Sequence, residues 1–107
     1  MELRRIFFNL DLEQLRSLLV AVLGTLEGFD ASVVDEHCAE VANLQGDDDA
    51  MMETDVLYEG DPSPVIVNTF RKGPEEFEVI FIVGDELVER IKVQANDVCG
   101  VAPQQVL

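Results

Sequence analysis

The spacing of apolar residues changes from a helical period to a period of two near residue 54, and this change limits the folds open to the chain. Before it, two stretches place apolar residues at three- and four-residue steps, as amphipathic helices do. After it, short alternating runs are separated by turns rich in glycine and proline. The 107 residues, 48% of them hydrophobic, supply one compact core. We therefore expect a single α+β domain over residues 1–107, a two-layer sandwich of an N-terminal helical hairpin packed on a three- to four-stranded antiparallel sheet.

The helical half has start and stop signals at both of its helices. Asp11 and Gln14 form a capping box before the first helix, which Gly28 ends. Asp30 caps a second helix, which Gly46 ends. The short link between them predicts two antiparallel helices. The expected core-facing residues are Leu12, Leu15, Leu18, Leu19, Val22, Leu23 and Leu26 in the first helix and Val33, Val34, His37, Cys38, Val41 and Leu44 in the second.

Alternation predicts three strands in the second half. They are Asp55–Glu59, Val65–Arg71 and Phe77–Val83, and the turns between them are short enough for an antiparallel meander. In the last strand, Ile80 and Ile82 lie between the residues of the main apolar face, so their side chains make the other face apolar too. Both faces of that strand should therefore be covered.

Two segments fit both a helix and a strand. For residues 2–10 we favour a first strand, because a compact apolar run is followed by a polar break. For residues 86–96 the alternation in ERIKVQ favours a fourth strand, with a short helical turn at Asp97–Val101 after it. A helix capped by Asp85 is the alternative for residues 86–96.

The net charge of −15 is concentrated in one span. No lysine or arginine occurs between Arg16 and Arg71, whereas residues 17–70 contain twelve acidic residues. Such a field attracts cationic protein surfaces and repels nucleic acid and anionic lipid, so we expect a basic protein partner, no direct nucleic-acid binding and no membrane partner. The acids expected to contact the partner are Asp35, Glu36, Glu40, Asp47, Asp48, Asp49, Glu53, Asp55, Glu59 and Asp61.

The run of three aspartates raises the question of a metal site. In an EF-hand loop counted from Asp47, glycine should be sixth and glutamate twelfth, but these positions hold Met52 and Tyr58. A looser site made by Asp47, Asp49 and Glu53 is the alternative, although adjacent carboxylates on a loop are usually solvated. We expect no metal and no cofactor.

No group of residues in the sequence forms a catalytic signature. His37, Cys38 and Cys99 lack the ligand spacing of a zinc site, and neighbouring helical residues point about 100° apart. We expect a core histidine and a buried, reduced thiol on the second helix, and no enzyme activity. Met51 and Met52 have two interpretations: one of them plugs the edge of the core, or the pair anchors a partner within the acidic surface.

The cations that follow the acidic span lie on a predicted turn. Arg71 and Lys72 are close in sequence to Glu75 and Glu76. Opposite charges on an exposed turn form weak ion pairs. We expect a local ion-pair cluster here rather than a basic patch for nucleic acid.

Two functions fit these features. The longest apolar run near the N-terminus, Leu18–Leu23, is too short for a membrane span, and we expect a soluble cytoplasmic protein. The first hypothesis is a small non-catalytic binding protein that docks an anionic face on a basic protein surface, such as an inhibitor or immunity protein that mimics nucleic acid. The alternative is a homodimeric structural or assembly module, resembling an adaptor or chaperone, which associates through the second apolar face of its sheet and is acidic for solubility only.

Overall fold

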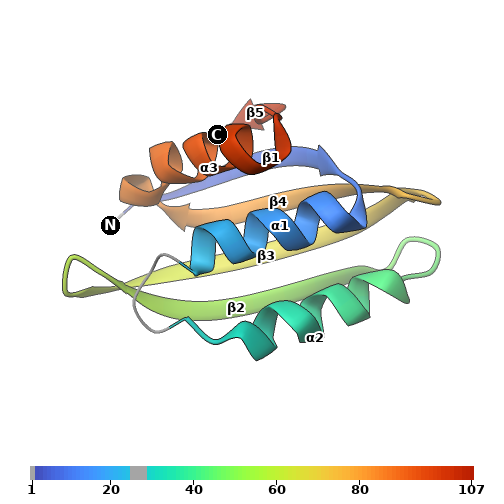
Figure 1. Cartoon of the computed structure of the whole chain (residues 1–107), viewed down its shortest axis with the longest axis horizontal. Helices are drawn as coiled ribbons and strands as arrows, with labels where there is room; N and C mark the ends of the chain where they lie inside the picture. The colour runs from blue at the N-terminus through green and yellow to red at the C-terminus, as the bar shows by residue number, and fades with distance from the viewer. Residues whose placement is uncertain (1, 25–28) are drawn as a thin grey trace.

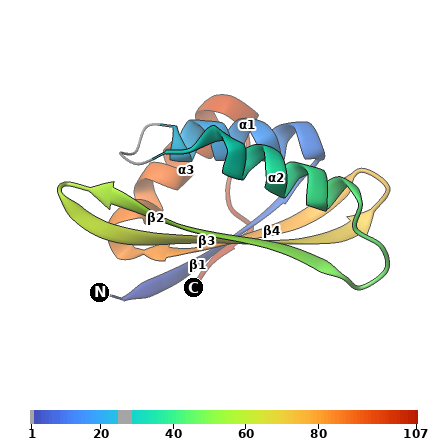
Figure 2. The ribbon, with the colours of Figure 1, turned by 90° about the horizontal axis from the view of Figure 1, so that it is seen from below.

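The computed structural model describes residues 2–24 and 29–107. These residues form a five-stranded antiparallel sheet with three α-helices on one of its faces (Figures 1 and 2). The α+β class is therefore confirmed. None of the helices in the described ranges combines the length and the apolar character needed to cross a membrane. The elements in chain order are β1 (Leu3–Leu10), α1 (Leu12–Leu23), α2 (Ala31–Ala42), β2 (Asp49–Tyr58), β3 (Asp61–Gly73), β4 (Glu76–Gly84), the 3-10 turn η1 (Asp85–Leu87), α3 (Val88–Cys99) and β5 (Gln105–Val106).

The strand order in the sheet is β2-β3-β4-β1-β5. The strands β2, β3 and β4 form the expected meander, and the strand favoured for residues 2–10 is also present. β1 pairs with β4 along its whole length, from Leu3 opposite Gly84 to Leu10 opposite Phe77. The sheet thus has more strands than the three or four expected, because the first strand is inserted between β4 and the short β5.

The segment that follows β4 is helical, so the preferred fourth strand at residues 86–96 is wrong. Both edges of β4 are already occupied, one by β3 and the other by β1, and a further hairpin strand has no free edge to pair with. Leu87, Val88 and Ile91 are buried, and α3 packs against α1. The turn expected at Asp97–Val101 contains the last residues of α3 and its C-cap.

β2 begins at Asp49, six residues before the predicted start at Asp55. Ala50 and Met52 are buried on its helix-facing side, while Asp49, Met51 and Glu53, which alternate with them, are exposed. Acidic residues and alanine are both rare in strands, so the alternation of buried and exposed residues was not recognised in the sequence. Residues 49–54, which lie between the expected helix end at Gly46 and the expected strand start at Asp55, are therefore part of a strand.

β3 is also longer than predicted, because the turn before it is only two residues long. Glu59 and Gly60 have positive φ angles of 54° and 86° and connect Tyr58 to Asp61, its pairing partner. Two consecutive positive φ angles are typical of a type I′ hairpin. The prolines predicted to break the chain before Val65 instead lie within β3.

The first helix begins as the sequence predicts. Asp11 accepts a hydrogen bond from the main-chain N–H of Gln14 at 2.7 Å, and the Gln14 side chain accepts one from the N–H of Asp11 at 3.0 Å. The expected helix end at Gly28 and the expected core residue Leu26 lie outside the described residues. The described helix ends at Leu23.

The helical layer contains three helices, with α1 between α2 and α3 (Figure 1). The expected two-helix layer was therefore incomplete. Asp30 caps α2 as predicted, by accepting hydrogen bonds from the N–H and hydroxyl of Ser32. These bonds lower the pKa of the Asp30 carboxyl. α2 ends at Ala42 instead of Gly46, which has a φ of 61° in the link to β2.

The two faces of the sheet differ in burial. The helix-facing side chains of the central strands are almost fully buried, and the rings of Phe8 and Phe81 meet edge to face at 5.9 Å. On the opposite face, which no described helix covers, Ile80 and Ile82 are only partly buried (Figure 2). No helix of the described residues covers this second face, so the prediction that β4 is covered on both faces stays a prediction.

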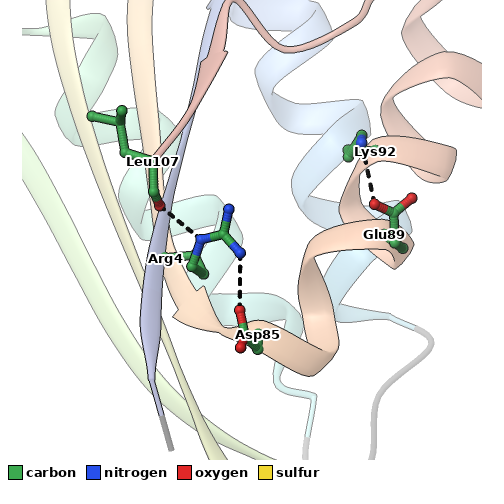
Figure 3. Close-up of polar contacts among 5 residues, drawn as sticks. All are labelled: Arg4, Asp85, Glu89, Lys92 and Leu107. Carbon is green, nitrogen blue, oxygen red and sulfur yellow. Dashed lines mark hydrogen bonds and ion pairs between the residues drawn. The ribbon is translucent and has the colours of Figure 1, made fainter.

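Arg4 of β1 binds two other segments of the chain, the C-terminal residue and the start of η1. Its Nε donates to the main-chain oxygen of Leu107 at 3.0 Å, and its Nη1 lies 3.1 Å from the Asp85 carboxylate (Figure 3). The main chain of Leu107 also exchanges two hydrogen bonds with Arg5. These contacts fix the C-terminal segment and the start of η1 against β1.

Candidate protein-binding surface

The acids of α2 lie on the side of the helix that is turned away from the core. Val34, His37, Cys38 and Val41 are buried, and the helical period leaves the three acids exposed. Asp35 forms an ion pair with Arg16 of α1, with 2.7 Å between Oδ1 and Nη2. The exposed acids of this helix are Asp35, Glu36 and Glu40.

Two further acids lie in the link between α2 and β2. Asp47 and Asp48 are exposed, and the N–H of Asp48 donates to the carbonyl of Gln45 at 3.2 Å, which closes a turn. The positive φ of Gly46 belongs to the same turn. The turn directs the chain from the end of α2 into the edge strand β2.

The remaining acids follow β2 and its hairpin. Asp49, Glu53 and Asp55 are exposed on the open face of the sheet, because they alternate with the residues that face the helices. Glu59 and Asp61 are exposed at the hairpin that joins β2 to β3. The acids of β2 therefore point to the opposite side of the sheet from α2.

We call these ten acids of α2, β2 and the two adjoining turns the acidic edge. The structure brings them to one edge of the molecule, because β2 is an edge strand and α2 packs on it. They do not form the single face expected from the sequence, since one group lies on the helical side and another on the open sheet face. A surface that contacted all ten would have to wrap around the edge of the sheet.

A hollow of about 600 Å³ lies between the start of α1, the end of α2 and the turn from β3 to β4. Arg16 and Arg71, which bound the cation-free span in the sequence, both line it. Arg16 is engaged by Asp35, and Arg71 is engaged by main-chain carbonyls. The fold thus gathers the two flanking cations next to the end of the acidic helix.

Arg71 acts as a structural cation at this hollow. Its guanidinium donates to the carbonyls of Leu44 at 3.0 Å and Ala42 at 3.3 Å, and to that of Pro74 at 2.8 Å. It also lies over the Phe77 ring, 4.8 Å from the centroid. These bonds satisfy carbonyls at the C-terminal end of α2, where a positive charge is favoured. The ion-pair cluster expected for Arg71 on the turn is replaced by this arrangement.

His37 and Cys38 are part of the core, as the sequence predicts. They are 2% and 7% exposed, and burial raises the pKa of the Cys38 thiol. Cys99 is partly buried, neither thiol is in a disulfide, and burial also raises the pKa of Cys99. Raised thiol pKa values lower the thiolate fraction at neutral pH, and with it the nucleophilicity.

The two methionines have different environments. Met52 is 7% exposed and belongs to the core, whereas Met51 is 58% exposed on the open face of β2. The interpretation in which one methionine plugs the edge of the core is confirmed for Met52. Met51 belongs to an apolar patch on the open sheet face, which includes Phe7 and Ile66. From the sequence, only Ile80 and Ile82 of β4 were identified as members of this patch. The alternation of Ile66 and Phe70 in β3 was the signal that could have found more of it.

Within residues 2–24 and 29–107, no three His, Cys, Asp or Glu side chains are grouped so that they could hold a metal ion. Comparisons of the chain with protein-family models, with curated proteins and with solved structures gave no match.

Proposed function

We propose that this chain is a small non-catalytic binding protein that docks its acidic edge on a basic protein surface. The observation that carries the proposal is the span of residues 17–70, which has twelve acids and no lysine or arginine. Ten of these acids are exposed on α2, β2 and the adjoining turns. An inhibitor or immunity protein that occupies the nucleic-acid site of a nuclease or DNA-binding protein would use the acids on one side of this edge, since the ten acids do not share one face.

Carboxylates are suited to this role because they accept charge-assisted hydrogen bonds from arginine and lysine, as backbone phosphates do. The concentrated negative field would also speed the encounter with a cationic partner. The flanking cations support the same interpretation, because Arg16 and Arg71 are held by Asp35 and by main-chain carbonyls. Arg16 is engaged by one acid of the edge, and Arg71 is engaged by carbonyls at the end of α2 and in the link that follows it.

The first test is capture of partners from a lysate on the immobilised chain at about 50 mM and about 500 mM salt. We expect basic proteins to be retained at low salt and released at high salt. The proposal is contradicted if no basic protein is retained at low salt, or if retention does not depend on salt.

Matched charge variants then locate the binding surface on the retained partner. The edge variant neutralises four exposed acids of α2 and the loop, E36Q/E40Q/D47N/D48N. The control variant changes the net charge equally by neutralising four exposed acids elsewhere, E2Q/E76Q/E89Q/D97N. In calorimetric titrations the edge variant should weaken binding at least about tenfold and the control less than about threefold. Equal losses would show that total charge, and not the acidic edge, determines binding.

A further inference from the structure

The open face of the sheet carries a largely apolar centre, interrupted by Asn68 and Glu78, between two charged margins. The centre consists of partly buried side chains from three strands together with the exposed Met51. Positive charge is contributed by Arg5 on β1, and acids line the other margin on β2. The apolar side chains of the centre are Phe7, Met51, Ile66, Phe70, Ile80 and Ile82.

We propose that two copies of the chain pack these open faces together, about a two-fold axis that runs parallel to the strands between β3 and β4. This inference goes beyond the proposed function, because it concerns the open face of the sheet, which shares only the β2 acids with the acidic edge, and a different partner. Such an axis places β4 of one copy over β3 of the other, and β1 over β2. Sheets that pack face to face with aligned strands lie about 10 Å apart, which is a common arrangement.

One row of side chains across the sheet is self-complementary under this axis. Pairing between neighbouring strands aligns Arg5, Ile82, Ile66 and Glu53 in that order on the open face. The two-fold axis reverses the order in the second copy. Ile82 then lies over Ile66 of the second copy, and Arg5 lies over its Glu53. An isologous interface needs this property, since each contact occurs twice.

The adjacent row adds an apolar contact of the same kind. It runs Phe7, Ile80, Asn68 and Met51, so Phe7 of one copy lies over Met51 of the other. Burial of Met51 would remove a large exposed apolar side chain from water, and the contact between a thioether and a ring is favourable. The two rows lie near the middle of the strands, where two twisted sheets that pack face to face lie closest together.

Asn68 lies in this second row, next to the axis. Its Oδ1 is buried and has no hydrogen-bond partner among the described residues. A buried amide oxygen without a partner is costly. The axis places the Asn68 side chains of the two copies on either side of it, so a rotation of each amide toward the interface would let each donate to the Oδ1 of the other.

The proposed dimer divides the acidic edge in two. It covers Glu53 and neighbouring acids of β2, and it leaves Glu36 and Glu40 exposed, because α2 lies on the helical side of the sheet (Figure 2). A dimer therefore carries two copies of the helical part of the edge. The covered acids contact the second copy, and the exposed acids contact a basic partner. Either proposal can therefore be contradicted by experiment while the other still holds.

The test is sedimentation velocity of the whole chain, from about 1 µM to about 500 µM at about 150 mM salt. We expect the mass to rise with concentration from the 11.9 kDa of one chain to twice that value. A chain that stays monomeric throughout overturns the proposal, including the case in which a different protein covers this face.

Two charge-reversal variants establish the orientation of the dimer. In R5E and in E53R each axis-related contact joins like charges, so each variant alone should dimerise at least about tenfold more weakly. An equimolar mixture of the two restores opposite charges at both contacts and should associate about as well as the unchanged chain. Both side chains are exposed, and circular dichroism checks that the variants fold. A dimer that is insensitive to both reversals, or a mixture that does not associate, overturns the proposed face and axis.

Discussion

The Nε2 atom of His37 on α2 lies 2.9 Å from the hydroxyl oxygen of Thr69 on β3, and both side chains are buried. Burial lowers the pKa of His37 to about 4, because the imidazolium would lose its hydration there. The Nδ1 atom is buried without a hydrogen-bond partner among the described residues. The ring is therefore neutral in the folded protein at neutral pH, and it links the acidic helix to the centre of the sheet.

This relationship predicts that the protein loses stability as the pH falls from about 7 to about 5. In the unfolded chain His37 has a pKa of about 6.5, so between this value and about 4 the unfolded state binds a proton that the folded state does not. The free energy of unfolding should fall by about 2 kcal/mol between pH 7 and pH 5 through this residue alone. Urea denaturation at a series of pH values measures it.

The control for the pH effect is H37Q, which does not titrate but retains groups that can bond to Thr69. The difference in unfolding free energy between the unchanged chain and H37Q should shrink by the same amount over this pH range. If the two curves run parallel, His37 does not carry the effect.

A second prediction concerns the hydroxyl of Thr69. T69V keeps the shape of the side chain but leaves the buried Nε2 of His37 without its partner, which should cost about 1–3 kcal/mol of stability at pH 7. T69S keeps the hydroxyl and should lose less. Thermal unfolding of both variants compares them, and equal losses would show that packing and not the hydrogen bond is responsible.

A third prediction separates two adjacent cations. R71M removes the donors that bind the carbonyls of Ala42 and Leu44, and we expect a loss of about 2 kcal/mol together with faster amide exchange at the end of α2. Lys72 is exposed, so K72M should change stability by less than about 0.5 kcal/mol. Similar effects of the two substitutions would mean that net charge matters here and not the capping of α2.

A fourth prediction uses the two methionines. M52A removes a buried side chain at the edge of the core and should cost about 2–3 kcal/mol, whereas M51A should change stability by less than about 0.5 kcal/mol. Chemical denaturation at micromolar concentration, where association is minimal, measures both values. A larger effect of M51A than of M52A would show that the two faces of β2 are assigned in reverse.

The sequence predicted best the elements that have local signals. The capping box of Asp11 and Gln14 and the helical spacing after it are properties of neighbouring residues, and the structure retains them. The same is true of the alternation in β4. The α+β class followed from these patterns, without knowledge of contacts between distant residues.

What the sequence did not predict depends on contacts between distant residues. Residues 86–96 satisfy both periods, and the helix forms because β1 already occupies the edge of β4 that a hairpin would need. The start of β2 at Asp49 depends on the burial of Ala50 and Met52 beneath α2. The split of the acidic edge between two sides of the sheet follows from the same unexpected length of β2. Neither the position of β1 nor that of α2 over β2 is encoded in a local pattern.

The pairing of β1 with β4 has a consequence for the order of events during synthesis. Phe7 pairs with Ile80, which lies 73 positions later in the chain, so the ribosome must release about three quarters of the protein before β1 has a partner strand. Until then Ile6 and Phe8 have no sheet to join, and chaperones have time to bind them. The nascent chain is therefore expected to acquire protease resistance in one late step, after β4 has emerged, and not progressively from its N-terminus.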